Sequence, residues 1–127
     1  MRFLSIWKAV EQNSPPTADE IERMGQLIDQ MSKRGELIAT EGCLPSALGA
    51  RVRRAGKRVT VTDGPFTESK ELIAGFAVLE APSKEAAIEL CKTFMEVAGD
   101  GECELRQIYS AAPEVATSGS GASAARA

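Results

Sequence analysis

The fold of this chain is decided by residues 72–109, LIAGFAVLEAPSKEAAIELCKTFMEVAGDGECELRQIY. Residues 72–80 are rich in branched and aromatic side chains, which is typical of a strand. Ser83 is a good N-cap, and the apolar residues after it recur at helical spacing. These are Ala87, Leu90, Cys91, Phe94 and Val97. Two glycines end the helix, and residues 102–109 complete a β-α-β unit.

The first part of the chain has the same order of elements. Residues 2–8 have the alternating pattern of a strand. Thr17 and Glu20 form a capping box for a helix that is expected to end near Arg34. A second strand is predicted at 36–43. Two β-α-β units in one chain predict an α+β protein with the split βαβ of the ferredoxin-like fold.

The two units are separated by a predicted insertion. Residues 47–53 and 57–62 are expected to form an inserted β-hairpin around a basic turn. One domain is expected to span 1–110. Beyond it, Ala, Ser, Gly and Thr dominate without an apolar period, so 111–127 is predicted to be a disordered C-terminal tail.

The predicted sheet has more apolar surface than its own helices can cover. Two helices cover one face, yet Leu4 and Ile6 alternate with Phe3 and Trp7 along the first strand. An apolar sheet face without helices predicts a partner. We therefore expect a homodimer in which two sheets face each other and enclose a space, as a dimeric α/β barrel does.

Composition argues against several classes of protein. The net charge of −3 and pI of about 5.1 argue against a nucleic-acid partner. The basic stretch 51–58 is predicted to be a solvated hairpin tip, with phosphate binding as the alternative. No apolar run is long enough to span a membrane, and Lys8 interrupts the first apolar stretch too early for a signal peptide. Three widely separated cysteines are typical of reduced thiols, which predicts a cytoplasmic protein.

The chain contains no histidine. Ser-His-Asp and Cys-His nucleophile systems are therefore excluded, as are histidine-bearing zinc sites. Three scattered cysteines do not provide a four-thiolate site in one chain. We expect neither a metal nor a cofactor, and any acid–base chemistry falls to Asp, Glu, Lys, Tyr or Cys.

The stretch with the most potential chemistry is 62–76, TDGPFTESKELIAGF. Asp63 precedes a Gly-Pro turn, which a purely structural elbow also explains. Glu68 and Lys70 lie in a polar loop held by Phe66 at one end and by a strand at the other. They are candidates for a carboxylate base and an ammonium that stabilises a developing anion. Asp63, Glu68 and Lys70 are thus the candidate catalytic residues, and solvated loop residues are the alternative.

Other charged residues are expected to line the space between the two sheets. Glu104 and Arg106 alternate in the last strand and share a face, so Arg106 is a candidate clamp for a ligand carboxylate. Lys8 ends the first strand and Glu41 lies near the end of the second. Glu71 joins them from the polar loop. These residues are the candidate ligand-binding set, and solvated strand ends are the alternative.

Three stretches carry a resemblance to a known family. VTDGPFTESKELIAGF at 61–76 resembles the signature of the YCII-related proteins of the DGPF subgroup. LIATEGCLPSALGARVR at 37–53 resembles the segment before that signature, with Cys43 where leucine is usual. ELRQIY at 104–109 is similar to the family's last strand. The resemblance covers about 1–110 and implies a ferredoxin-like fold that forms a dimeric α/β barrel.

The resemblance implies two possible functions. Some YCII-like relatives are enzymes that act on small aromatic molecules, with a His–Asp pair proposed as the acid–base couple. This chain lacks the histidine, so of that pair only the aspartate is present, as Asp63. A cofactor-independent lyase, isomerase or dehalogenase for a small anionic or aromatic molecule is one hypothesis. The other is a non-catalytic, ligand-sensing regulator associated with an extracytoplasmic-function sigma factor, because similar proteins are genome neighbours of such factors.

Overall fold

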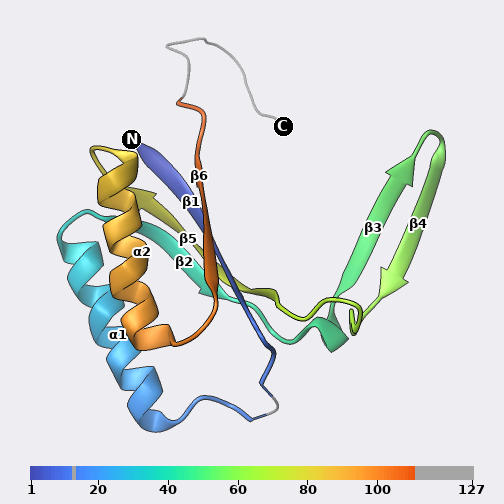
Figure 1. Ribbon diagram of the computed structural model, residues 1–127, viewed down its shortest axis with the longest axis horizontal. Helices are drawn as coiled ribbons and strands as arrows, with labels where there is room; N and C mark the ends of the chain where they lie inside the picture. The colour runs from blue at the N-terminus through green and yellow to red at the C-terminus, as the bar shows by residue number, and fades with distance from the viewer. Residues whose placement is uncertain (13, 111–127) are drawn as a thin grey trace.

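The computed structural model describes residues 1–12 and 14–110, so the predicted tail at 111–127 lies outside the described residues. The elements are β1 (Arg2–Ala9), α1 (Ala18–Lys33), β2 (Leu37–Gly42), the single 3-10 turn η1 (Ser46–Leu48), β3 (Ala50–Ala55), β4 (Arg58–Asp63), β5 (Leu72–Glu80), α2 (Lys84–Ala98) and β6 (Glu102–Gln107). Figure 1 shows their arrangement.

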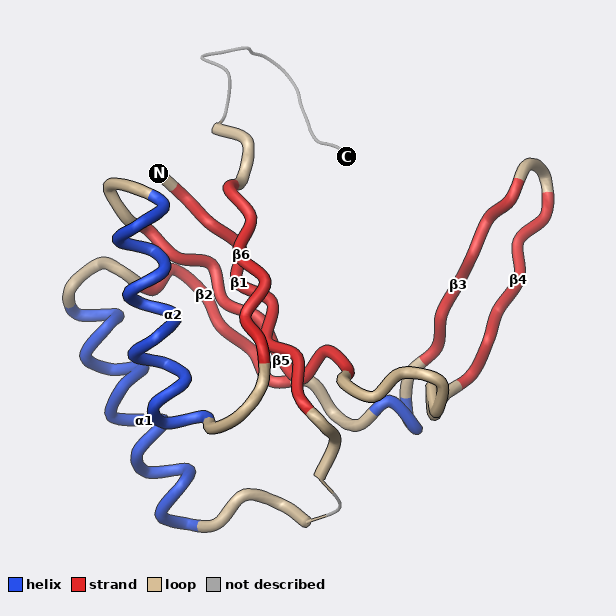
Figure 2. Tube along the Cα trace, viewed as in Figure 1, coloured by secondary structure: helices blue, strands red, loops and turns tan. Residues whose placement is uncertain are grey.

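The main sheet has four strands in the order β2-β5-β1-β6, and every neighbouring pair is antiparallel. Both helices lie on the same face of this sheet (Figure 1). The predicted α+β, ferredoxin-like split βαβ is therefore confirmed. The inserted hairpin is also present, and β3 and β4 form a separate two-stranded sheet that projects from the other side of the molecule (Figure 2).

The helices begin where the capping signals predict. The Thr17 hydroxyl accepts a hydrogen bond from the Glu20 backbone N–H at 3.1 Å, and the Glu20 carboxylate accepts one from the Thr17 N–H at 2.8 Å. At α2, the Ser83 hydroxyl accepts from the Ala86 N–H at 3.1 Å. These bonds satisfy N–H groups that a helix leaves unpaired in its first turn.

The core lies between the helices and the covered face of the sheet. It consists of Phe3, Leu27, Met31, Leu79, Ala81, Ala87 and Cys91. The apolar stripe predicted for α2 packs here as expected. The helical spacing of apolar residues also predicts Ile21 on the buried side of α1, but Ile21 is 59% exposed, because the first turn of α1 extends past the end of α2 (Figure 1).

The hairpin differs from the prediction at both ends. Residues 46–48 form η1 instead of a strand, because the Glu11 carboxylate accepts hydrogen bonds from the Ser46 backbone N–H at 2.6 Å and from its hydroxyl at 2.8 Å. The tip is a two-residue turn at Gly56 and Lys57, one residue later than predicted. Gly56 has φ +62°, which a tight hairpin turn requires and glycine adopts readily.

Candidate functional site

The strand register separates the two faces of the main sheet. The face without helices has an apolar centre on the two middle strands and charged residues on the two outer ones. The centre consists of Leu4 and Ile6 of β1 with Phe76 and Val78 of β5. The margins are Glu41 of β2 and Glu104 and Arg106 of β6, which lie opposite Phe76, Ile6 and Leu4 respectively.

Three of the predicted ligand-binding residues are neighbours on this face. The Lys8 ammonium donates a hydrogen bond to the Glu104 carboxylate at 2.7 Å, and the Arg106 guanidinium donates to its other oxygen at 3.3 Å. The hydrogen bond from Lys8 lowers the pKa of Glu104, and the same bond raises the pKa of Lys8. Arg106 is 72% exposed, so most of its N–H donors face solvent and are open to a ligand or a partner.

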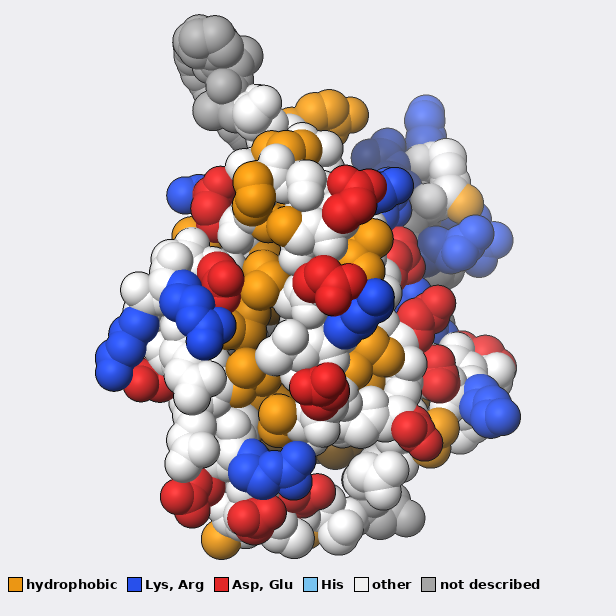
Figure 3. Space-filling model, turned by 60° about the vertical axis from the view of Figure 1, so that its left-hand side comes forward, with side chains coloured by type: hydrophobic (Ala, Val, Ile, Leu, Met, Phe, Trp, Pro, Cys, Tyr) orange, Lys and Arg blue, Asp and Glu red, His pale blue; other side chains and the backbone are white. Residues whose placement is uncertain are grey.

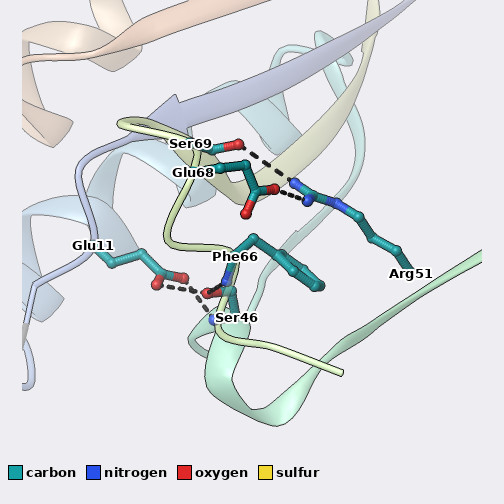
Figure 4. A network of polar contacts seen from close by, with 6 residues as sticks. All are labelled: Glu11, Ser46, Arg51, Phe66, Glu68 and Ser69. Carbon is teal, nitrogen blue, oxygen red and sulfur yellow. Dashed lines mark hydrogen bonds and ion pairs between the residues drawn. The ribbon is translucent and has the colours of Figure 1, made fainter. Parts of the chain in front are cut away.

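The polar loop between β4 and β5 is tied to the hairpin (Figure 4). The Arg51 guanidinium pairs with the Glu68 carboxylate, donates to the Ser69 hydroxyl at 3.5 Å, and lies 3.9 Å from the centre of the Phe66 ring. The hydrogen bond from Arg51 lowers the pKa of Glu68. A carboxylate that is held ionised by a paired guanidinium is a weak general base.

Asp63 and Lys70 lie at the two ends of this loop. Asp63 is the exposed last residue of β4, and Lys70 is exposed just before β5. Next to Asp63, the Gly64 N–H donates to the Gly49 carbonyl at 3.0 Å. A Cβ at Gly64 would overlap the Ser46 carbonyl oxygen, so this position requires glycine because the backbones approach closely. The Asp-Gly-Pro-Phe stretch is therefore an elbow that closes the base of the hairpin.

A cavity of about 630 Å³ lies at the end of the sheet where β1 ends and β5 begins. Its walls combine apolar and aromatic surface with three carboxylates: Trp7, Ala9, Val10, Glu11, Gln12, Cys43, Pro45, Glu71, Ile73, Ala74, Ala98 and Asp100. Of the predicted site residues, Glu71 alone lines it. The cavity adjoins the uncovered face, because its lining residue Ile73 is paired with Lys8 in the strand register.

Sequence reasoning missed most of the cavity wall. Trp7 is fixed by edge-to-face packing on Phe94, with ring centres 5.2 Å apart. A Cβ at Gly101 would come within 2.5 Å of the Trp7 ring, so glycine at this position leaves room for the indole. Cys43 is placed by its backbone N–H, which donates to the Ala74 carbonyl at 2.8 Å. These contacts join segments far apart in sequence, and the pattern of one chain gives no signal for them.

The other two cysteines lie away from this cavity. The Cys91 thiol of α2 is buried in the core, and its sulfur lies 3.6 Å from the Ser5 hydroxyl. Cys103 is partly buried against the same core. Hydrogen bonding to Cys91 and burial raise the pKa of Cys103. Cys43 is thus the exposed thiol among the three.

These features define a class of protein: a ferredoxin-like α+β domain with one bare sheet face, a projecting hairpin and an acidic, aromatic-walled cavity. The chain belongs to the YCII-related domain family, whose model matches residues 1–119. The predicted family is confirmed, and assignment to the DGPF subgroup stays a prediction. No curated protein matches the chain. No helix among residues 1–12 and 14–110 is long and apolar enough to cross a membrane.

Proposed function

We propose that the protein is a homodimer that binds a small molecule in the cavity at the end of its sheet. The observation that carries this proposal is the cavity wall, where an indole and several aliphatic side chains lie beside a few polar groups. Small-molecule sites combine apolar surface with placed polar groups, and this wall divides about evenly between the two.

The lining favours one ligand class over another. Three lining residues, Glu11, Glu71 and Asp100, carry carboxylates, and none of the lining residues is Lys or Arg. An anion in this cavity would be repelled, whereas an aromatic molecule with a hydroxyl or amino group would gain apolar contact and a hydrogen bond. Of the anionic and aromatic ligands expected from the sequence, the aromatic one is therefore preferred.

The homodimer is supported by the uncovered face of the sheet. Its apolar centre, Leu4, Ile6, Phe76 and Val78, is bordered by charged residues on both edges. An apolar centre with a polar rim is the usual composition of a protein–protein interface. Two copies that stack these faces bury the centre and bring the rim residues of both copies together around the enclosed space.

An enzymatic form of this function rests on Glu71. Glu71 is the predicted site residue in the cavity wall, whereas the carboxylate of Glu68 is paired with Arg51 and that of Glu11 is bound by Ser46. Glu71, together with Asp100 of the same wall, is thus available as the general base for a cofactor-independent lyase, isomerase or dehalogenase. Asp63 and Lys70, which lie outside the cavity wall, stay candidates through their position in the signature loop.

The alternative function is a non-catalytic, ligand-sensing regulator associated with an extracytoplasmic-function sigma factor. The absence of histidine favours it, because the acid–base pair of YCII-like enzymes is then incomplete. The same cavity would serve as the sensor. Co-purification with a sigma factor, changed by a cavity ligand, would favour this alternative over the enzyme.

Cys43 makes the cavity directly testable. Its thiol is exposed and lines the wall, so a bound ligand will slow its alkylation. We expect some small phenols or aromatic amines both to raise the melting temperature and to protect Cys43, and small carboxylates to do neither. Peptide mapping with Cys43→Ser as the control assigns the label. If no compound in the panel does both, the proposed binding function is wrong.

A further inference from the structure

Among residues 1–12 and 14–110, the β3–β4 hairpin pairs with no other strand. All twelve of its strand residues are exposed. It stands away from the main sheet on the side opposite the helices (Figures 1 and 2). A single two-stranded hairpin is marginally stable in water at best. We therefore expect this extended hairpin to pack on another protein surface.

Three valines lie on one face of the hairpin, which also carries Ala50, Arg54 and Asp63. Val52 is paired with Val61, and Val59 follows on the same face opposite Arg54. The three valines are 69%, 64% and 61% exposed in that order. The opposite face carries Arg, Thr and Ala side chains. The valines make their face the more apolar of the two and the one suited to burial, whereas the other face is suited to solvent.

The base of the hairpin is held in place although its tip is free. Arg51 joins the first strand to the loop residues Phe66 and Glu68 (Figure 4). The Gly64 N–H closes the base by donating to the Gly49 carbonyl. The hairpin is therefore presented at a set position, and this lowers the entropy lost when a partner binds it.

The hairpin differs in charge from the rest of the molecule. Arg51, Arg53, Arg54, Lys57 and Arg58 lie within residues 50–63 together with a single acidic residue, Asp63. These basic side chains form the group at the upper right of Figure 3. Because the whole chain has a net charge of −3, the remainder carries all the excess negative charge. The body of a second copy is thus electrostatically complementary to the hairpin.

We propose that the β3–β4 hairpin is an arm that packs its valine face on the body of a second copy seated on the uncovered sheet face. The inference rests on the proposed homodimer and adds a second contact to it. The bare face and the hairpin lie on the same side of the sheet, so a copy bound to one lies next to the other (Figure 1). The valines lose water on contact, and Arg54, which shares their face, meets an acidic surface.

The test compares two substitutions in the same strand by sedimentation velocity. Val61→Asp places a charge on the valine face, and Thr60→Asp places the same charge on the opposite face. Because both positions are exposed in the single chain, neither change disturbs its core. We expect Val61→Asp to raise the dimer dissociation constant about tenfold or more, and Thr60→Asp to change it by less than about threefold.

The outcomes separate this inference from the function it rests on. A wild-type protein that is monomeric at micromolar concentration overturns the homodimer itself. If the wild type is a dimer and Val61→Asp does not change its dissociation constant, the proposed arm contact is wrong and the homodimer still holds. Hydrogen exchange on the wild type gives an independent measurement: amides of 51–62 are expected to exchange more slowly at high protein concentration than at low. If the amides of 51–62 exchange freely in the dimer and are protected only when nucleic acid is added, the proposed arm contact is wrong.

Discussion

The two faces of the main sheet are built from the same strands, but the helices cover only one of them. Along β1, Phe3 and Trp7 point to the helices, where Phe3 is 1% exposed and Trp7 packs on Phe94. Leu4 and Ile6 point to the other face, where no helix of the described chain covers them. Both sets are apolar, so the hydrophobic effect acts on both. The difference is that helices of the same chain cover one face, whereas in our proposal a second copy covers the other.

A substitution on the helix-covered face of the sheet is expected to destabilise the protein most. Phe3→Ala removes a fully buried ring from the core and is expected to lower the free energy of unfolding by about 3–5 kcal/mol. Urea denaturation followed by circular dichroism measures the loss. The matched control is Leu4→Ala, one residue along on the bare face. An equal loss for both substitutions in dilute protein would contradict the distinction between the two faces.

The next prediction concerns the bare face. Ile6→Asp puts a charge in its apolar centre and is expected to raise the dimer dissociation constant about 30-fold or more, while the fold is kept. The wild-type melting temperature should rise with protein concentration, because a dimer is stabilised by mass action, and that of the variant should not. A wild-type melting temperature that does not change with protein concentration would count against the homodimer.

A third prediction sharpens the comparison between the body and the hairpin. Gly64→Ala forces a methyl group onto the Ser46 carbonyl at the base of the hairpin and is expected to destabilise the protein by about 1–3 kcal/mol. Gly42→Ala is the control, because the space around that position is open. Chemical denaturation of both variants checks the prediction, which fails if the two losses are the same.

The smallest expected effect is at the charged edge of the bare face. Lys8 lowers the pKa of Glu104, so the stabilisation from Glu104 is present above the unfolded carboxyl pKa, about 4.3, and is lost as pH falls through the lower folded value. Glu104 raises the pKa of Lys8, so that contribution is present below the unfolded ammonium pKa, about 10.4, and is lost as pH rises through the higher folded value.

Glu104→Gln should therefore lower the melting temperature slightly at neutral pH, and the difference from wild type should shrink in acid. The effect is small because the pair is partly exposed and screened by solvent. Glu89→Gln, which removes an exposed ion pair with Lys92 on α2, is the control. A difference that grows as the pH falls would contradict the assignment.

Local patterns were sufficient to predict most of the fold. Capping residues such as Thr17 and Ser83 act within a few positions, and strand alternation is a property of adjacent residues. The ends of the hairpin were predicted less well. The turn η1 depends on Glu11, which is 35 residues away from Ser46, so no local sequence pattern predicts it.

The candidate site was harder to predict, for the same reason. Lys8, Glu104 and Arg106 were grouped correctly on one face, because alternation in strands carries that information. The partner of Glu68 was missed, because Arg51 comes from a hairpin whose position follows from tertiary contacts. The cavity itself is formed by chain segments from four separate regions, and the sequence pointed to Glu71 alone among its lining residues.

The central claim is that a second copy covers the bare face of the sheet. Sedimentation equilibrium of the wild-type protein at micromolar concentration tests it most directly. We expect a mass near twice the chain's 13.5 kDa, reduced to that of one chain by Ile6→Asp. A wild-type mass of 13.5 kDa across the concentration range would contradict it.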